Sequence, residues 1–250
     1  MKITIVLPTY NEAENLPKLV SALFILPLEL TVLVVDDNSP DGTGQIAEDL
    51  RSAYPGRVRV LHRTGKLGLR SAYFEGFREA IESGAEAVVQ MDADFSHNPT
   101  VLEEMARRIT DYDVVIGSRY TKGGSLDDNW PRWRKFLSAF GNTYARTILH
   151  FPQRDVTTGF RMWRREVLSQ IPLERIRSNG YIFLVEMAYV AYLMGFKILE
   201  VPIHFEDRRF GKSKMSLKIQ LEAATRIWDV AWHYRDMRKK KLIQEIKPGN

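Results

Sequence analysis

Short runs of apolar residues alternate with amphipathic segments along the first half of the chain. The apolar runs are rich in β-branched residues and have no polar face, so they predict strands that are buried on both sides. The amphipathic segments predict helices that join parallel strands by right-handed crossovers. The expected strands cover residues 3–7, 31–35, 58–62, 87–91 and 113–118, and the expected helices cover 12–23, 41–54, 71–84 and 98–109. The pattern predicts an α/β fold, with helices on both faces of a mostly parallel central sheet.

The second half of the chain is less regular. Its pattern predicts helices over 130–149, 162–171 and 181–194, a strand over 197–205, a basic segment over 207–214 and a long amphipathic helix from about Met215. The sequence shows no internal repeat and no interdomain linker. We therefore expect one catalytic domain over residues 1–214, followed by a basic amphipathic helix and tail over 215–250.

No segment is expected to span a membrane. The longest apolar stretch, residues 181–195, is shorter than the roughly 20 residues that a spanning helix needs, and Glu186 lies inside it. The apolar run at the N-terminus is short and meets Pro8, which predicts a first strand rather than a signal peptide.

Composition narrows the class of protein. Of the 250 residues, 44% are hydrophobic and 27% are charged, which is typical of a globular protein. The chain has no cysteine, which excludes disulfides, thiolate zinc sites and cysteine nucleophiles. A net charge of +5 and a pI near 9.3 indicate an anionic partner: nucleic acid, a phosphorylated substrate or an anionic membrane surface. The sequence holds no nucleic-acid-binding module, no G-x-G-x-x-G pattern and no P-loop, so we expect no nucleic-acid partner, dinucleotide-dependent redox activity or P-loop ATPase activity.

Two carboxylates one residue apart, Asp92 and Asp94, follow the strand predicted over 87–91. Side chains at positions i and i+2 of a strand share a face, so these acids would repel each other unless a cation lay between them. Carboxylate oxygens suit Mg²⁺ or Mn²⁺, and such an ion can bridge to a nucleotide diphosphate. We expect the nearby His97 to be a structural residue rather than a metal ligand.

Polar residues also end two other predicted strands, and the carboxyl ends of parallel strands meet at one ligand-binding edge. The first strand ends near Tyr10, and a helix starting near Asn11 or Glu12 would turn backbone donors toward that edge. The second strand ends at Asp36 and Asp37, whose carboxylates could accept hydrogen bonds from a base or a ribose.

A set of motifs occurs in order along the chain: PTYNE, VVDDNSPDGT, GKLGL with SAY, MDADFSHNP, GSRY, the D-x-x-T-G-F-R of residues 155–161, and DRRFGKSK. From Ile3 to about Met215, the chain resembles the dolichyl-phosphate mannosyltransferases, also called polyprenyl monophosphomannose synthases. These are inverting enzymes of glycosyltransferase family 2 with the glycosyltransferase-A fold. The resemblance implies metal-dependent, inverting transfer of mannose from GDP-mannose to dolichyl or polyprenyl phosphate, which yields a β-mannosyl phosphate lipid and GDP.

The resemblance also implies roles for individual residues. Those implied to bind the nucleotide sugar are Pro8, Tyr10, Glu12, Asp36, Asp37, Lys66 and Asp92. Those implied to hold the metal are Asp92, Asp94 and Ser96, of which Ser96 stands where some relatives carry glutamine. The loop of residues 158–161 would lie under the sugar. The chain departs from its relatives at Arg70, where glycine is common, and this cation would either assist the diphosphate or point into solvent.

The chemistry of the acceptor gives a separate argument. A phosphate monoester has a second pKa of about 6, so at neutral pH its oxygen is already a largely deprotonated nucleophile and needs no general base. The site instead needs fixed cations that hold the acceptor phosphate beside C1 of the sugar. The candidates for this task are Arg119, Arg134, Ser138, Arg208 and Lys214. We expect the catalytic residues to be Asp94, Arg119, Arg134 and Arg208.

Two segments have the pattern of helices that lie in a membrane interface. In the first, Trp130, Trp133, Phe136, Leu137 and Phe140 recur at helical spacing beside Arg132, Arg134 and Lys135. The terminal helix repeats the pattern with Leu217, Leu221, Ala224, Trp228 and Ala231, followed by Arg235, Arg238, Lys239, Lys240 and Lys241. We expect a peripheral enzyme on the cytoplasmic side of a membrane, attached directly or through a small membrane-anchoring subunit. The alternative is that these are ordinary helices packed on the sheet.

Three alternative functions stay open at this point. The enzyme could transfer glucose or another hexose, or use UDP in place of GDP. The acceptor could be a glycan hydroxyl, which would require a general base. The chain could also be a noncatalytic nucleotide-binding or lipid-binding module.

Overall fold

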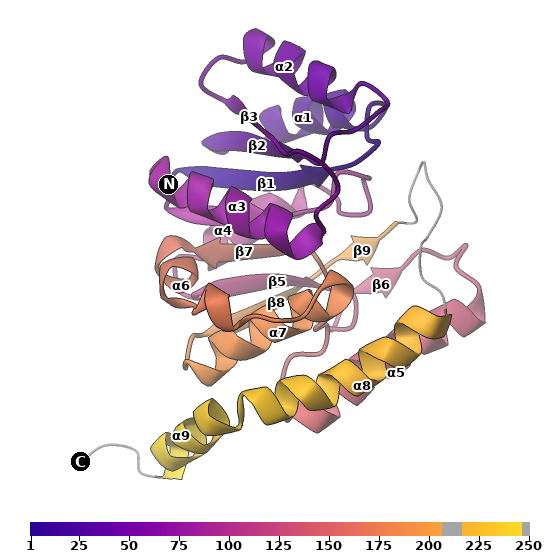
Figure 1. Cartoon of the computed structure of the whole chain (residues 1–250), viewed down its shortest axis with the longest axis vertical. Coiled ribbons are helices and arrows are strands. Elements are labelled where there is room, and N and C mark those ends of the chain that lie inside the picture. The colour runs from indigo at the N-terminus through magenta and orange to yellow at the C-terminus, as the bar shows by residue number, and fades with distance from the viewer. Residues whose placement is uncertain (207–216, 247–250) are drawn as a thin grey trace.

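The computed structural model describes residues 1–206 and 217–246 of the chain. The strands of its main sheet are β1 (Ile3–Thr9), β2 (Leu30–Asp36), β3 (Val58–His62), β4 (Ala87–Gln90), β5 (Val114–Ser118), β7 (Arg161–Arg164) and β8 (Ile198–Pro202). They lie in the order β3-β2-β1-β4-β7-β5-β8 (Figure 1). β7 runs antiparallel to its neighbours β4 and β5, and the other neighbouring pairs are parallel. Two short strands, β6 (Ser125–Leu126) and β9 (His204–Phe205), form a separate parallel pair.

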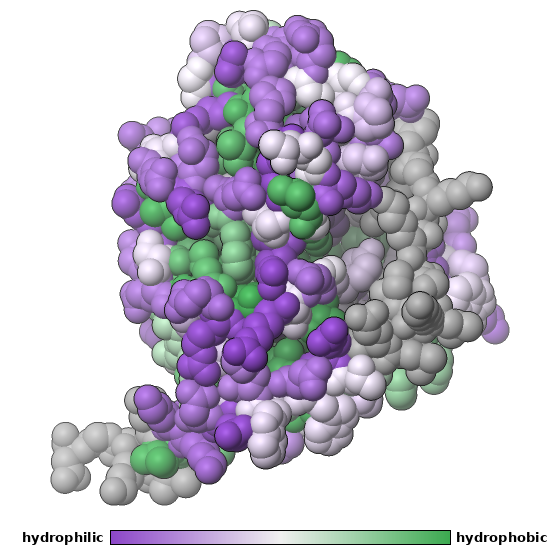
Figure 2. Space-filling model, viewed as in Figure 1, coloured by the Kyte–Doolittle hydropathy of each residue, from purple (hydrophilic) through white to green (hydrophobic). Residues whose placement is uncertain are grey.

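Helices cover both faces of the main sheet. α1 (Leu16–Phe24), α2 (Thr43–Ala53) and α4 (Val101–Arg108) pack on one face, and α3 (Leu69–Glu82), α6 (Arg165–Gln170) and α7 (Gly180–Leu193) pack on the other. Neighbouring strand residues point to opposite faces, so Val6 packs with the second group of helices and Ile5 with the first. The outer sides of α2 and α3 are mostly hydrophilic (Figure 2). The predicted α/β fold, with a mostly parallel sheet covered on both faces, is confirmed.

The last helices pack beside α7. α5 (Arg132–Leu149) and α8 (Leu217–His233) lie side by side, and α9 (Arg235–Ile246) follows them (Figure 1). Ile227 and Val230 of α8 join the same hydrophobic cluster as α7. No helix within residues 1–206 or 217–246 is both long and apolar enough to cross a membrane. The predicted domain boundary between residues 214 and 215 falls outside the described residues.

The expectation of a helix over 162–171 is wrong for its first part. Residues 161–164 form the strand β7, and only the residues from Arg165 to Gln170 are helical. Met162 and Trp163 are both fully buried and pack in the clusters on opposite faces of the sheet, as neighbouring residues of a strand do. A run of four residues is too short for its sequence to distinguish this alternation from a helix.

Three other boundaries differ from expectation. The single strand predicted over 197–205 divides into β8 and β9, which belong to different sheets. The first helix begins at Leu16 rather than near Asn11, because Asn11 has a positive φ of 63° and a turn follows it. The long terminal helix is interrupted at Tyr234, so it forms two helices, α8 and α9.

Candidate active site

The carboxyl ends of β1, β2, β4 and β5 meet at one edge of the main sheet, on the side where β6 and β9 lie (Figure 1). The residues that follow these strands are Tyr10, Asp37, the pair Asp92 and Asp94, and Arg119. The fold therefore brings residues predicted for the donor, the metal and the acceptor to the same edge, where ligands of parallel sheets bind.

The loop that carries the two acids turns sharply after β4. Phe95 has a positive φ of 62°, which is unusual for an aromatic residue and indicates a tightly constrained turn. This turn folds Ser96 back onto Asp94, so that the backbone N–H of Ser96, at 3.0 Å, and its hydroxyl both donate to Asp94 Oδ1. Asp94 is only 4% exposed, and Ser96 holds its carboxylate in place. Direct binding of a metal by Ser96 stays a prediction.

A buried tyrosine lies close to this loop. The hydroxyl of Tyr73, on α3, donates to the backbone carbonyl of Met91 at 3.2 Å. Burial raises the pKa of Tyr73 well above its usual value, and the carboxylates of Asp92 and Asp94 raise it further. The two acids therefore create a region of concentrated negative charge, which a divalent cation would neutralise.

The arrangement of the acids fits Mg²⁺ or Mn²⁺, which prefer hard oxygen ligands. Gly159 faces Asp92, and a Cβ atom at Gly159 would lie 3.5 Å from both carboxylate oxygens of Asp92. In the part of the chain that the structure describes, no group of three or more His, Asp or Glu side chains could hold a metal ion. A cation between Asp92 and Asp94 would therefore take further ligands from water and from a bound diphosphate.

Two side chains hold the 155–160 loop, which contains Gly159, in place. The guanidinium of Arg119 forms a two-point ion pair with Asp155, and its Nε and Nη2 atoms are each 2.7 Å from a carboxylate oxygen. Asn142, on α5, accepts hydrogen bonds from the backbone N–H groups of residues 156 and 157, at 2.9 and 3.2 Å. The loop is therefore fixed to both β5 and α5.

The sequence alone predicts no role for Asp155, Asn142 or Glu200. Asp155 is fully buried, and its backbone N–H donates to Glu200, on β8, at 2.8 Å. Asp155 and Glu200 are 45 positions apart in the chain, so no local pattern reveals their contact. Asp155 is the first residue of the D-x-x-T-G-F-R motif, and this motif is the sequence signal that could have indicated a role for it.

Two buried arginines near this loop differ in their surroundings. Burial by itself would lower the pKa of Arg119, but the carboxylate of Asp155 outweighs this effect and raises it. Arg161 donates to the backbone carbonyls of Val156, at 2.8 Å, and Leu184. Burial lowers the pKa of Arg161 to about 10. Arg161 is fully buried, so it supports the loop from inside the protein.

The predicted donor residues Asp36 and Asp37 are both buried. The carboxylate of Asp36 accepts hydrogen bonds from the hydroxyl of Thr9 at 3.0 Å and from the hydroxyl and backbone N–H of Ser39 at 2.6 and 3.0 Å. It thereby ties the ends of β1 and β2 together. Asp37 pairs with Arg63, a residue for which the sequence predicts no role. Burial raises the pKa of Asp37, and Arg63 opposes that rise.

The backbone donors after β1 are used within the protein, contrary to expectation. The N–H groups of residues 11–13 donate to three side chains that follow β2, namely Ser39 and Asp41 in the loop and Thr43 at the start of α2. Two predicted donor residues do lie together here, because Nζ of Lys66 is 3.9 Å from the centre of the Tyr10 ring. Pro8 is part of β1, and the Glu12 carboxylate accepts a hydrogen bond from Asn15 at 2.8 Å.

Arg70 was expected either to assist the diphosphate or to point into solvent, and it makes a contact that neither expectation included. Its Nη1 atom donates to the backbone carbonyl of Ile176 at 3.0 Å. Arg70 therefore ties the first turn of α3 to the segment that precedes α7.

The predicted acceptor side is formed by the end of β5 and the first turns of α5. The hydroxyl of Tyr120, next to Arg119, donates to that of Ser138 at 2.6 Å. Cζ of Arg134 lies 3.7 Å from the centre of the Trp130 ring. Arg208 and Lys214 lie outside the described residues, so their predicted roles stay predictions.

The predicted membrane-facing stripes need correction. Trp130 lies before α5 and is only 7% exposed, so it does not belong to an exposed stripe. On α8, Trp228 is exposed, whereas Ala224 and Ala231 are half-buried. The side chains of Leu217 and Leu221 are outside the described residues.

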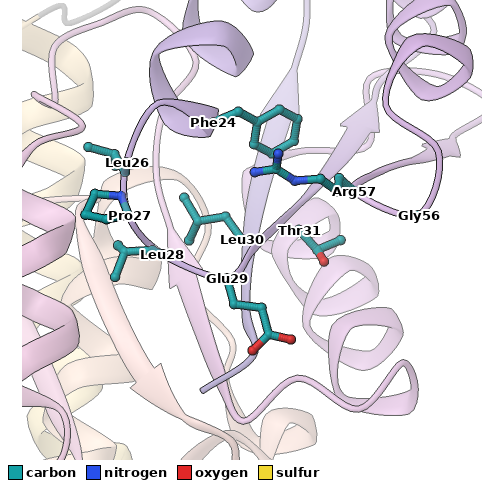
Figure 3. A pocket seen from close by; sticks show the side chains of 9 residues that line it. All are labelled: Phe24, Leu26, Pro27, Leu28, Glu29, Leu30, Thr31, Gly56 and Arg57. Carbon is teal, nitrogen blue, oxygen red and sulfur yellow. The ribbon is translucent and has the colours of Figure 1, made fainter.

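A groove of about 530 Å³ lies at the opposite edge of the sheet, where β2 begins. Its lining includes Phe24, Leu30 and Arg57 (Figure 3). Cζ of Arg57 lies 3.8 Å from the centre of the Phe24 ring. The groove is formed at the amino ends of the strands, so it is separate from the edge that carries the acids.

Comparison with known proteins gives close relatives in sequence. A family model described as glycosyl transferase family 2 matches residues 4–171. The chain is 45% identical over 213 residues to a polyprenol monophosphomannose synthase of Mycolicibacterium smegmatis, covering 85% of this chain and 80% of that protein. It is 43% identical over 240 residues to an undecaprenyl-phosphate mannosyltransferase of Micrococcus luteus, covering 95% of this chain and 98% of that protein.

Solved structures support the fold. A glucosyl-3-phosphoglycerate synthase from Mycobacterium tuberculosis, in complex with Mn²⁺, UDP and phosphoglyceric acid, matches with a TM-score of 0.64 and 14% identity, over 92% of this chain and 76% of that one. A mannosyl-3-phosphoglycerate synthase from Rubrobacter xylanophilus matches with a TM-score of 0.65 and 16% identity, over 96% of this chain and 75% of that one. The predicted glycosyltransferase-A fold is confirmed.

Proposed function

This chain belongs to glycosyl transferase family 2 and is a glycosyltransferase, and from that premise we propose that it transfers mannose from GDP-mannose to a polyprenyl phosphate. The observation that carries the proposal is the pair Asp92 and Asp94 at the carboxyl edge, beside the fixed 155–160 loop and Arg119. The printed names of the two relatives, a polyprenol monophosphomannose synthase and an undecaprenyl-phosphate mannosyltransferase, support the same donor sugar and the same class of acceptor.

The donor would bind across the ends of β1, β2 and β4. Bound between Asp92 and Asp94, Mg²⁺ or Mn²⁺ would neutralise charge that develops on the departing diphosphate. Tyr10 and Lys66, which lie together after β1, would contact the nucleotide. The remaining residues assigned to the nucleotide sugar are Pro8, Glu12, Asp36 and Asp37. Gly159 leaves room beside Asp92, so the sugar would lie against the 155–160 loop.

The acceptor would approach from the side of β5 and α5. Its phosphate oxygen is already a nucleophile at neutral pH, so the protein has to orient it for in-line attack on C1 of the mannose. Arg119 and Arg134 would hold this phosphate, with Ser138 beside them, and Arg208 and Lys214 would complete the cation cluster. A single displacement inverts the configuration at C1 and gives a β-mannosyl phosphate lipid.

An exposed aromatic surface on α5 and α8 would meet the membrane that holds the lipid acceptor, on its cytoplasmic side. We define this aromatic surface by Trp133, Phe136 and Phe140 of α5 and Trp228 and Trp232 of α8, which are 54–71% exposed. The two parts are continuous. The rings of Phe140 and Tyr144 stack with 6.1 Å between centroids, and the indole N–H of Trp228 donates to the Tyr144 hydroxyl at 3.0 Å.

Basic residues accompany the aromatic surface. Arg132 is exposed at the start of α5, and Cζ of Arg235 lies 4.2 Å from the centre of the Trp232 ring. Aromatic side chains beside basic ones are typical of helices in an anionic membrane interface. The same surface would suit a small membrane-anchoring subunit.

The test of the function is a transfer assay on the purified protein. Labelled GDP-mannose, Mg²⁺ or Mn²⁺ and a short-chain polyprenyl phosphate should give label in the organic phase, and the unphosphorylated polyprenol should give none. UDP-glucose serves as the competing donor. If only labelled UDP-glucose gives a labelled lipid, the donor is UDP-glucose rather than GDP-mannose. If neither lipid becomes labelled with either donor, the proposed reaction is wrong.

A further inference from the structure

Four aromatic side chains form a continuous column between the loop of the two acids and the acceptor side of the site. The ring of His97 stacks on that of Phe160, with 4.9 Å between centroids, and meets Phe205 edge-on at 5.6 Å. Phe205 in turn meets the indole of Trp130 edge-on at 5.6 Å. Phe160, His97 and Trp130 are 0%, 1% and 7% exposed, so most of the column is closed to water.

Each member of this aromatic column belongs to a different part of the site. Phe160 ends the 155–160 loop, His97 follows the two acids, Phe205 ends β9, and Trp130 lies two residues before α5. Backbone contacts reinforce the column, because His97 and Phe205 form a β-bridge and the N–H of Asp127 donates to the carbonyl of Phe205 at 2.9 Å. The column therefore fixes the start of α5 relative to the loop of the acids.

Two arginines rest on the aromatic column. Cζ of Arg134 lies 3.7 Å from the centre of the Trp130 ring, which is a close cation–π contact. Cζ of Arg119 lies 5.2 Å from the centre of the Phe205 ring. These are the two arginines to which the proposed function assigns the acceptor phosphate within the described residues.

We propose that the aromatic column sets the distance between the two acids and the acceptor-binding arginines, and that Trp130 is a positioning residue for Arg134. The inference rests on the proposed function, because it requires Arg134 to bind the acceptor phosphate. An arginine side chain has many rotamers, and contact with a buried indole selects among them before the acceptor arrives. The acceptor phosphate then meets a preorganised guanidinium at a fixed distance from the donor sugar.

The ring face of Trp130 is the part that serves this role. Its indole nitrogen is buried and has no hydrogen-bond partner among the residues that the structure describes. Phenylalanine keeps a ring face and loses no hydrogen bond, whereas leucine removes the ring. Trp130→Phe is therefore the conservative variant, and Trp130→Leu is the disruptive one.

Initial rates with a short-chain polyprenyl phosphate in detergent give separate KM values for acceptor and donor. We expect Trp130→Leu to raise the acceptor KM about three- to tenfold and to change the donor KM less than about twofold. Trp130→Phe should restore most of the acceptor KM. The matched control is Phe24→Leu, which removes a similar contact with Arg57, at 3.8 Å, on the opposite edge of the sheet and should change neither KM.

A double-mutant cycle with Arg134→Ala distinguishes positioning from general damage. If Trp130 acts through Arg134, Trp130→Leu should raise the acceptor KM little further in the Arg134→Ala background. Additive effects, or equal rises in both KM values that Trp130→Phe does not rescue, would overturn the inference. If Trp130→Leu does not fold, Trp130→Met repeats the test with an unbranched side chain that adapts to the space. A wild-type protein that forms no lipid-linked mannose would overturn the proposed function, and the inference with it.

Discussion

The guanidinium of Arg119 binds the carboxylate of Asp155 at two points, and both side chains are almost completely buried. The backbone N–H of Arg119 donates to the same carboxylate at 2.9 Å. The pair therefore joins the end of β5 to the 155–160 loop, between the proposed donor and acceptor sites. Because Asp155 already balances the charge of Arg119, a bound acceptor phosphate would need a further cation, a role that the proposed function assigns to Arg134.

We expect Asp155→Asn to lower the free energy of unfolding by about 3–5 kcal/mol, since removing one partner of a buried ion pair leaves the other charge uncompensated. Urea unfolding followed by circular dichroism measures this change. The control is Asp128→Asn, because Asp128 is fully exposed and lies 3.9 Å from Lys135 in a surface ion pair. Exposed pairs contribute little to stability. Equal effects of the two substitutions would contradict the structural role of Asp155.

Asn142→Ala should lower the free energy of unfolding by about 2–4 kcal/mol, because the backbone N–H groups of residue 156, which is buried, and residue 157, which is half-buried, lose their acceptor. The released 155–160 loop should also raise the KM for GDP-mannose in the transfer assay. The neighbouring Thr143 is exposed on the same helix, so Thr143→Ala is the matched control. A stable Asn142→Ala protein with an unchanged donor KM would show that the loop is held by other contacts.

Asp94→Asn should reduce transfer by about a thousandfold or more, since a bound divalent cation is worth several kcal/mol in the transition state. Affinity for Mn²⁺, measured by titration calorimetry, should fall in parallel. An active Asp94→Asn enzyme would show that the metal assignment is wrong.

Tyr234→Phe should lower the free energy of unfolding by about 1.5–3 kcal/mol, the usual contribution of a buried hydrogen bond to a charged group. The hydroxyl of Tyr234, between α8 and α9, lies 2.9 Å from the carboxylate of Glu186 on α7 and 3.0 Å from the carbonyl of Arg175. Thermal unfolding with a single transition would show that the terminal helices unfold together with the core. The control is Tyr54→Phe, because Tyr54 packs through its ring against Phe24.

The sequence predicts the sheet, and the edge of it at which the candidate site residues lie, because both depend on local patterns. A continuous apolar run is visible wherever a strand is buried on both faces, and the polar residues after it, such as Asp92 and Asp94, must lie at the strand's end. The strand β7 could not be predicted in this way, because pairing with the neighbouring strands β4 and β5 determines which faces Met162 and Trp163 occupy. Its four residues carry too little pattern by themselves.

The contacts that hold the site together depend on the fold rather than on local pattern. Arg119 and Asp155 are 36 positions apart, and Arg63 and Asp37 are 26 apart, so either residue alone looks like an ordinary surface charge in the sequence. The opposite error occurs at Trp130, which the sequence predicts to be exposed and which is buried in the structure. Its helical spacing with Trp133 and Phe136 suggested an exposed stripe, but it precedes the helix and packs against Phe205.

The aromatic surface on α5 and α8 should bind anionic membranes, and the double substitution Trp228→Ser with Trp232→Ser tests this. Both indoles are mostly exposed, at 60% and 69%, so the fold should be retained, with the loss of one hydrogen bond from Trp228 to Tyr144. Burying an aromatic side chain in the interface is worth about 1.5–3 kcal/mol, so sedimentation with anionic vesicles should show at least about tenfold weaker binding. Transfer to a short-chain acceptor in detergent should stay close to that of the wild type, because neither tryptophan is assigned to the active site.

The control is Ile25→Ser, at an 83% exposed position on the other edge, and it should change neither vesicle binding nor transfer. If the double variant binds vesicles as well as the wild type does, membrane attachment belongs to another part of the chain or to a partner subunit.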